Sequence, residues 1–155
     1  YIVACMNPFA PGEADMQFET PVLGDQKTVE GVFTNFKYAY VFKDTVAYGK
    51  LLANDFNFIY TNYDRGVDVT WSREEDMITT HRLFNAVQNM DLSWNDVIVS
   101  TGDSVSQVVS RGFDLTIYFS TTDVINVQGR AEFHLKRPDT TSPWKITKWK
   151  DLSNY

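Results

Sequence analysis

The stretch RGFDLTIYFS (residues 111–120) alternates apolar and more polar side chains. Its apolar members are Phe113, Leu115, Ile117 and Phe119. A period of two places such residues on one face of a β-strand, so that one face is buried and the other is wet. The pattern continues through the chain after Asn89, where turn-rich pieces such as TGDS and TTD separate the apolar runs. We therefore expect long strands at residues 90–100, 105–121, 124–137 and 143–151.

The chain before Asn89 favours helices. Apolar residues recur there with helical spacing, at Val29, Phe33, Phe36 and Tyr40. Thr28 is placed to cap this helix, and Asp44 to cap a second helix after a kink. The residues Ser72-Arg73-Glu74-Glu75 have the form of a capping box, which predicts a third helix.

The order of these segments predicts the fold class. An aromatic-rich strand, residues 55–60, lies between the second and third helices. The later strands have short connections and must pair antiparallel, so helices grouped ahead of them predict an α+β domain. We expect one core that contains Phe33, Phe36, Leu51, Phe84, Leu115, Ile117 and Phe133.

Composition limits the classes of function. The chain has 155 residues, 43% of them hydrophobic, which fits one globular domain. A single cysteine, Cys5, excludes an internal disulfide, and the two distant histidines, His81 and His134, do not complete a zinc set. The net charge of −6 opposes nucleic-acid binding, which needs clustered Lys and Arg. We expect no metal, no cofactor and no nucleic-acid partner, and no apolar run is long enough to cross a bilayer.

The first 27 residues differ from the rest of the chain. They contain three of the five prolines and two of the eight glycines, which favours a flexible tether. We expect residues 1–27 to form this tether and residues 28–155 to form the domain.

Three strings carry a resemblance to a known family. They are TVEGVFTNFKYAYVFKDTVAYGKLLANDFNF (28–58), WSREEDMITTHRLFNA (71–86) and PWKITKWKDL (143–152). With the predicted order of elements, they resemble the NTF2-like (SnoaL-like) superfamily, and in particular small bacterial envelope lipoproteins that carry this domain. The resemblance implies a cone, in which a curved antiparallel sheet wraps a long helix and leaves a pocket. The superfamily includes enzymes, transport factors and subunits without chemistry, so the fold transfers more directly than the function.

The N-terminal string Ile2-Val3-Ala4-Cys5 is similar to a bacterial lipobox, in which small and branched apolar residues precede an acylated cysteine. The resemblance implies lipidation of Cys5 and a place in the bacterial cell envelope or outside the cell, with contact to the membrane only through the lipid. The alternative is an incidental cysteine in a flexible leader.

Enzymes of the superfamily place an Asp/His or a Tyr/Asp pair inside the cone. The candidates for such polar groups here are Asp55, His81, Tyr118 and Arg82. A histidine titrates near neutral pH and suits general-base catalysis. The structural alternatives are a half-buried surface histidine at His81 and a capping carboxylate at Asp55. No nucleophile elbow and no phosphate loop occur in the sequence.

The tryptophans indicate a contact surface. In the last strand, alternation puts Trp149 on the side opposite Trp144 and Ile146, unless a bulge changes the phase. A tryptophan exposed among lysines suggests an interface, either with a second copy or with another protein, on the outer face of the sheet. A carbohydrate-binding module is a further alternative, which needs coplanar exposed aromatic rings.

These features favour a non-enzymatic, envelope-associated binding or accessory domain. The alternative is a SnoaL-like small-molecule enzyme that uses acid–base residues in the cone.

Overall fold

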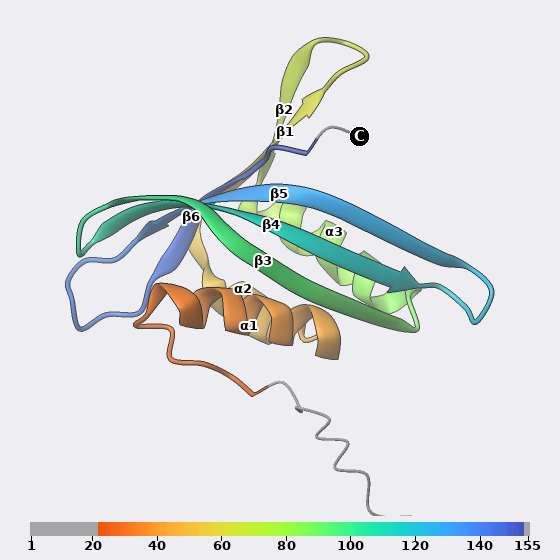
Figure 1. Cartoon of the computed structure of the whole chain (residues 1–155), viewed down its shortest axis with the longest axis horizontal. Helices are drawn as coiled ribbons and strands as arrows, with labels where there is room; N and C mark the ends of the chain where they lie inside the picture. Colours follow the sequence, from red (N-terminus) through yellow and green to blue (C-terminus); the bar gives the residue numbers. More distant parts are fainter. Residues whose placement is uncertain (1–21, 154–155) are drawn as a thin grey trace, which may run out of the picture.

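The computed structural model describes residues 22–153, which form three helices and six strands (Figure 1). The helices are α1 (Val29–Phe42), α2 (Thr45–Leu51) and α3 (Arg73–Ala86). The strands are β1 (Leu52–Asn62), β2 (Val67–Ser72), β3 (Asn89–Gly102), β4 (Ser106–Tyr118), β5 (Val124–Lys136) and β6 (Lys145–Asp151). The α+β class is confirmed. None of the helices in the described part of the chain is long and apolar enough to cross a membrane.

The helix starts follow the predicted caps. The Thr28 hydroxyl accepts from the Gly31 amide, and the Asp44 carboxylate accepts from the Ala47 amide. Between α1 and α2, Lys43 adopts a left-handed conformation (φ 53°), which makes the kink. At α3 the capping box is complete, since Ser72 and Glu75 each accept from the other's backbone amide.

One mixed sheet holds all six strands, in the order β2-β1-β6-β5-β4-β3. Its neighbours pair antiparallel except β1 and β6, which are parallel, so the expectation of an antiparallel sheet is wrong at this pair. The parallel pair is where the β1–β2 hairpin, which precedes α3, meets the strands that follow α3, with β6 beside β1. Figure 1 shows β3, β4 and β5 arching over α1, while the β1–β2 hairpin projects from the body.

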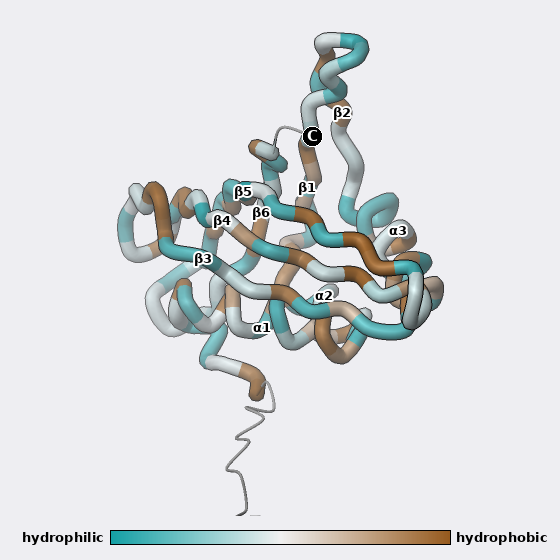
Figure 2. The backbone as a smooth tube through the Cα atoms, turned by 45° about the vertical axis from the view of Figure 1, so that its right-hand side comes forward, coloured by the Kyte–Doolittle hydropathy of each residue, from teal (hydrophilic) through white to brown (hydrophobic). Residues whose placement is uncertain are grey.

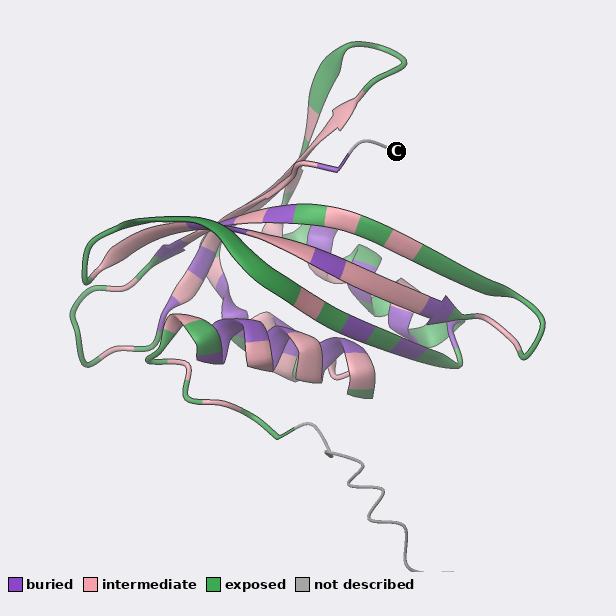
Figure 3. Ribbon diagram, in the orientation of Figure 1, coloured by how far each residue is buried: buried purple, intermediate pink, exposed green. Residues whose placement is uncertain are grey.

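The core lies between α1 and the inner face of the sheet. Phe33, Phe36 and Phe133 are almost completely buried, and their ring centroids lie 5.2–5.4 Å apart from helix to sheet. The predicted core is confirmed, with Leu115 only half-buried at its border. Figure 2 shows hydropathy alternating along the long strands, and Figure 3 shows the buried side of α1 turned toward them.

The expected exposure of Trp149 is wrong. A bulge at Thr147 shifts the register, because Leu135 pairs with Ile146 while the adjacent His134 pairs with Lys148. The extra residue reverses the alternation, so that Trp149 points inward like Ile146 and packs 5.7 Å from Phe133. The expected contact of the outer sheet face with a second chain stays a prediction without this anchor, and sedimentation velocity tests it.

The packed domain begins before residue 28, its predicted first residue. The Asn35 side chain is buried and pairs with the backbone of Gly24, accepting from its amide at 2.6 Å and donating to its carbonyl. Gln26 donates to the Trp144 carbonyl and accepts from the Trp144 amide through its backbone. A buried amide needs partners, and the segment before Thr28 supplies them. The packed unit therefore includes at least residues 24–27, and Cys5 lies outside the described residues.

Candidate functional site

A cavity of about 200 Å³ lies inside the cone, between α1 and the curved sheet. Its lining comes from α1 and from five strands: Phe36, Tyr40, Phe58, Leu92, Trp94, Phe113, Leu115, Val127, Trp149 and Asp151. Six of these ten side chains are aromatic, and only Tyr40 and Asp151 ionise. A partly open, mainly apolar space of this kind suits a small apolar ligand.

The strand register builds the sheet side of the cavity. Leu92 pairs with Leu115, and Leu115 pairs with Val127, so these three residues share the inner face. Gly129 lies opposite Phe113, and a Cβ atom at position 129 would approach the Phe113 ring to 2.6 Å. Glycine at this position therefore leaves the Phe113 ring in place at the cavity wall.

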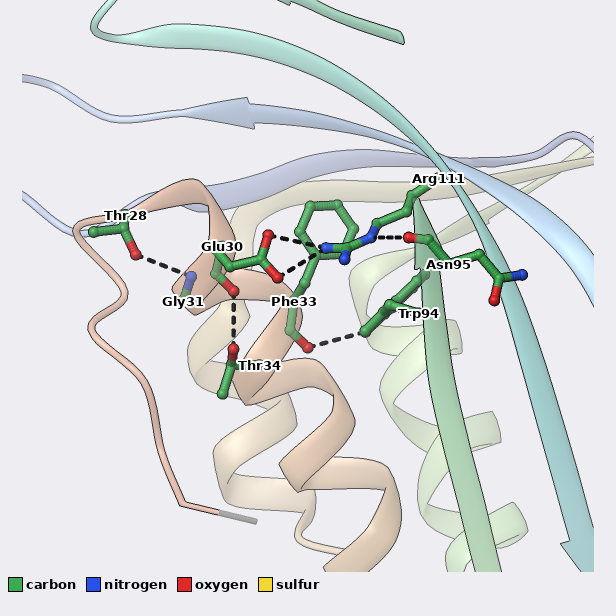
Figure 4. Close-up of polar contacts among 8 residues, drawn as sticks. All are labelled: Thr28, Glu30, Gly31, Phe33, Thr34, Trp94, Asn95 and Arg111. Carbon is green, nitrogen blue, oxygen red and sulfur yellow. Dashed lines mark hydrogen bonds and ion pairs between the residues drawn. The ribbon is translucent and has the colours of Figure 1, made fainter. Parts of the chain in front are cut away.

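Polar contacts at the start of α1 hold this helix over the cavity (Figure 4). The indole N–H of Trp94 donates to the Phe33 carbonyl at 3.0 Å, which fixes one wall of the cavity to α1. Arg111 stacks on the Phe33 ring at 5.0 Å and donates to both carboxylate oxygens of Glu30. The Glu30 side chain is 69% exposed, so the ring stacking and packing of Arg111 contribute more than the ion pair.

A buried polar cluster lies behind Tyr40. The Tyr48 hydroxyl donates to the Asp76 carboxylate at 2.6 Å, and both residues are buried. Burial raises the pKa of Asp76 to about 6, although the bond from Tyr48 opposes this shift. Burial and the Asp76 charge together raise the pKa of Tyr40, so the Tyr40 hydroxyl stays protonated at neutral pH.

The predicted catalytic candidates do not reach the cavity. Asp55 is exposed in a larger surface groove of about 830 Å³ between the β1–β2 hairpin and α3. His81 is exposed on α3, with Thr45 and Asn85 as hydrogen-bond partners. Tyr118 is 38% exposed at the end of β4, and Arg82 is also exposed. The expectation that these residues share the cone is wrong, because each side chain points away from the inner faces of its helix or strand.

The structure adds two carboxylates that sequence reasoning missed. Asp76 lies four residues before Thr80 and eight before Phe84, on the stripe that α3 buries, so its helical spacing gave a signal. The acidic neighbours Glu74 and Glu75 make the same position look solvated. Asp151 follows Trp149 by two residues and therefore lies on the same face of β6. The sequence pattern does not show that this is the inner face, because the bulge at Thr147 shifts the alternation. Among residues 22–153, no three His, Cys, Asp or Glu side chains gather as a metal-binding group.

Helices packed against a curved mixed sheet around an inner cavity define the NTF2-like cone fold. No protein-family model matches this sequence, and no curated protein matches it. Solved structures of that fold do match. A candidate dehydratase of the NTF2-like family from Streptomyces avermitilis superposes with a TM-score of 0.67 at 13% identity, covering 84% of this chain and 97% of the other.

Two further structures support the same fold. A candidate scytalone dehydratase from Novosphingobium aromaticivorans gives a TM-score of 0.68 at 11% identity, covering 82% of each chain. An NTF2-like protein of unknown function in nutrient uptake from Rhodospirillum rubrum gives 0.65 at 13% identity, covering 83% of this chain and 99% of the other. At these identities the likeness establishes the fold and leaves the activity open.

Proposed function

We propose that this domain binds a small, largely apolar molecule in the cone cavity and acts as a binding or accessory domain without chemistry of its own. The observation that carries the proposal is the lining, in which Asp151 is the one carboxylate among apolar and aromatic side chains. Acid–base catalysis needs a proton donor and an acceptor that both reach the substrate. The wall's other ionisable group, Tyr40, has a pKa raised by burial, which makes its hydroxyl a poor proton donor near neutral pH.

A cavity-filling pair of variants tests binding. Val127→Phe adds an aromatic ring inside the cavity, whereas Val124→Phe adds the same ring at an exposed position of the same strand. We expect the wild type and Val124→Phe to bind tert-butylbenzene, and Val127→Phe to lose at least about tenfold in affinity, because the ring takes the space of the ligand. Two readouts are the rise in melting temperature with ligand and the fluorescence of Trp94 and Trp149. Equal binding by both variants, or no binding by the wild type, contradicts the proposal.

An acid–base enzyme is the second candidate, and the cluster behind Tyr40 is the observation that favours it. Asp76 carries a carboxylate with a pKa near neutrality, and its charge acts on Tyr40, which lines the cavity. Two of the similar structures are named as candidate dehydratases. On this candidate, Tyr40 would donate a proton to a bound substrate while Asp76 acts behind it. The binding proposal is preferred because Asp76 itself does not line the cavity.

We also propose that the domain is held at a bacterial envelope by a lipid on Cys5. The support is the string Ile2-Val3-Ala4-Cys5, since acyl chains anchor a protein through their buried methylene groups. We expect the intact mass of the protein purified from its own source to fit an acylated cysteine at the mature N-terminus. A mass that retains residues 1–4 with an unmodified thiol contradicts the anchor.

A further inference from the structure

Asp151 is a charged group in an otherwise uncharged wall. It pairs with the buried Ala131 on β5, two residues after Trp149 pairs with Phe133, so Asp151 and Trp149 share the inner face. One carboxylate oxygen accepts from the Ser153 amide at 2.9 Å. Within residues 22–153, Arg111 forms an ion pair with Glu30 and His134 contacts Glu132 at 2.9 Å, and neither pair involves Asp151. Asp151 therefore has no ion-pair partner among residues 22–153, and a cationic ligand group beside it would supply one.

Where ring faces meet the cavity, the aromatic lining has the same electrostatic preference as the carboxylate. The face of an aromatic ring carries partial negative charge, and it attracts a cation in a desolvated site. The protein places its own cations over rings outside the cavity, with Arg111 on Phe33 and Arg137 on Trp144. No such contact occupies a cavity ring in the part of the chain that the structure describes. The net charge of −6 further favours a cationic ligand over an anionic one.

The volume of the cavity and the few oxygen atoms in its wall favour an organic cation over a metal ion. A simple metal ion needs several oxygen ligands, and the wall offers the Asp151 carboxylate and the Tyr40 hydroxyl among apolar groups. A cavity of about 150 Å³ already holds benzene, so about 200 Å³ admits a ring with a few more heavy atoms. An alkylated ammonium is less strongly hydrated than a metal ion, and aromatic side chains recognise such ions.

We propose that the cavity takes an organic ammonium ion with an apolar body, its charge facing Asp151 and its alkyl groups packed against Trp149 and Phe58. The proposal rests on the proposed function, because it names the ligand class of the same cavity. The rings of Trp149 and Phe58 lie 4.9 Å apart beside Asp151 and form the aromatic part of this subsite.

Two probes of the same shape test the charge. Phenyltrimethylammonium carries a nitrogen where tert-butylbenzene carries the central carbon of its butyl group, so the pair differs in charge alone. We expect the wild type to bind the ammonium probe at least about tenfold more tightly. Asp151→Asn removes this preference while it keeps the affinity for tert-butylbenzene, which also reports that the variant is folded. Asp114→Asn removes the same charge from the outer face of β4 and keeps the preference.

The outcomes separate the two proposals. If tert-butylbenzene binds as tightly as the ammonium probe, the ligand class is wrong and the cavity function stands. If neither probe binds the wild type, the cavity function fails as well. If Asp114→Asn abolishes the preference as Asp151→Asn does, net charge rather than Asp151 selects the cation, and the subsite assignment is overturned. Higher salt is expected to weaken binding of the charged probe only.

Discussion

Replacing Phe133 by alanine is expected to lower the free energy of unfolding by about 3–5 kcal/mol. Removal of a fully buried ring loses its apolar contacts and also leaves a cavity in the core. Phe133 is 0% exposed and lies at the centre of the aromatic cluster. Its ring contacts Phe33, Phe36, Trp94 and Trp149, with centroids 5.2–5.7 Å away. Equilibrium urea unfolding measures the loss, with an unchanged m-value as the sign that the unfolded state is the same.

The matched control for this change is Tyr118→Ala. Tyr118 lies on the neighbouring strand and is 38% exposed, so its replacement removes a ring of similar size from the outer face. We expect this control to cost under about 1 kcal/mol. A similarly small loss for Phe133→Ala would mean that helix α1 does not pack on the sheet through this ring.

The second large effect concerns Asp76 and depends on pH. The pKa of Asp76 is raised from 3.8 to about 6 by burial, so between these values the folded protein binds more protons than the unfolded chain. Stability therefore falls as pH rises from about 4 to about 6, and the full penalty of about 2–3 kcal/mol remains above that range. An asparagine side chain at this position stays neutral at every pH. We therefore expect the stability of Asp76→Asn relative to wild type to increase by about 2–3 kcal/mol as the pH rises from 4 to 7.5.

Unfolding curves give the free energy of unfolding of wild type and variant at pH 4 and at pH 7.5. The gain is the change, between the two pH values, in the stability difference between the two proteins. The bond from Tyr48 is retained in the variant, since the asparagine carbonyl also accepts it. Asp91→Asn, at an exposed position of β3, removes the same charge and is expected to change stability by under about 0.5 kcal/mol at both values. An Asp76→Asn advantage that is the same at pH 4 and pH 7.5 would exclude burial of the carboxylate as the cause.

The three helices could be predicted from signals that are local in the sequence. The caps at Thr28, Asp44 and Ser72 act within three residues of their partners, and the apolar spacing of α1 depends on that segment alone. The alternation along β4 and β5 is equally local, which is why the α+β class and most of the core could be predicted. Each of these features involves residues that are close together in the sequence, within a single helix or strand.

The cavity depends on pairings between distant segments. The parallel contact of β1 with β6 joins residues about ninety positions apart, for example Phe58 and Trp149, and no local pattern encodes it. Asp55 and His81 have residue types that suit an acid–base pocket, but residue type does not determine the direction of a side chain. Asp76 was readable from its helical stripe, whereas Asp151 needed the register of β6 against β5.

The bulge at Thr147 decides which charge the closing strand presents to the cavity. If β6 ran through Thr147 without a bulge, alternation from the buried Ile146 would carry Trp149 and Asp151 to the outside and bring Lys148 and Lys150 to the cavity wall. An acidic aromatic pocket would then become a basic one with no change of sequence. A chain that lacked Thr147 would keep Trp149 and Asp151 inward on a regular strand, because the bulge takes up that one residue. The local backbone conformation, rather than the order of side chains along β6, therefore sets the charge at the cavity wall.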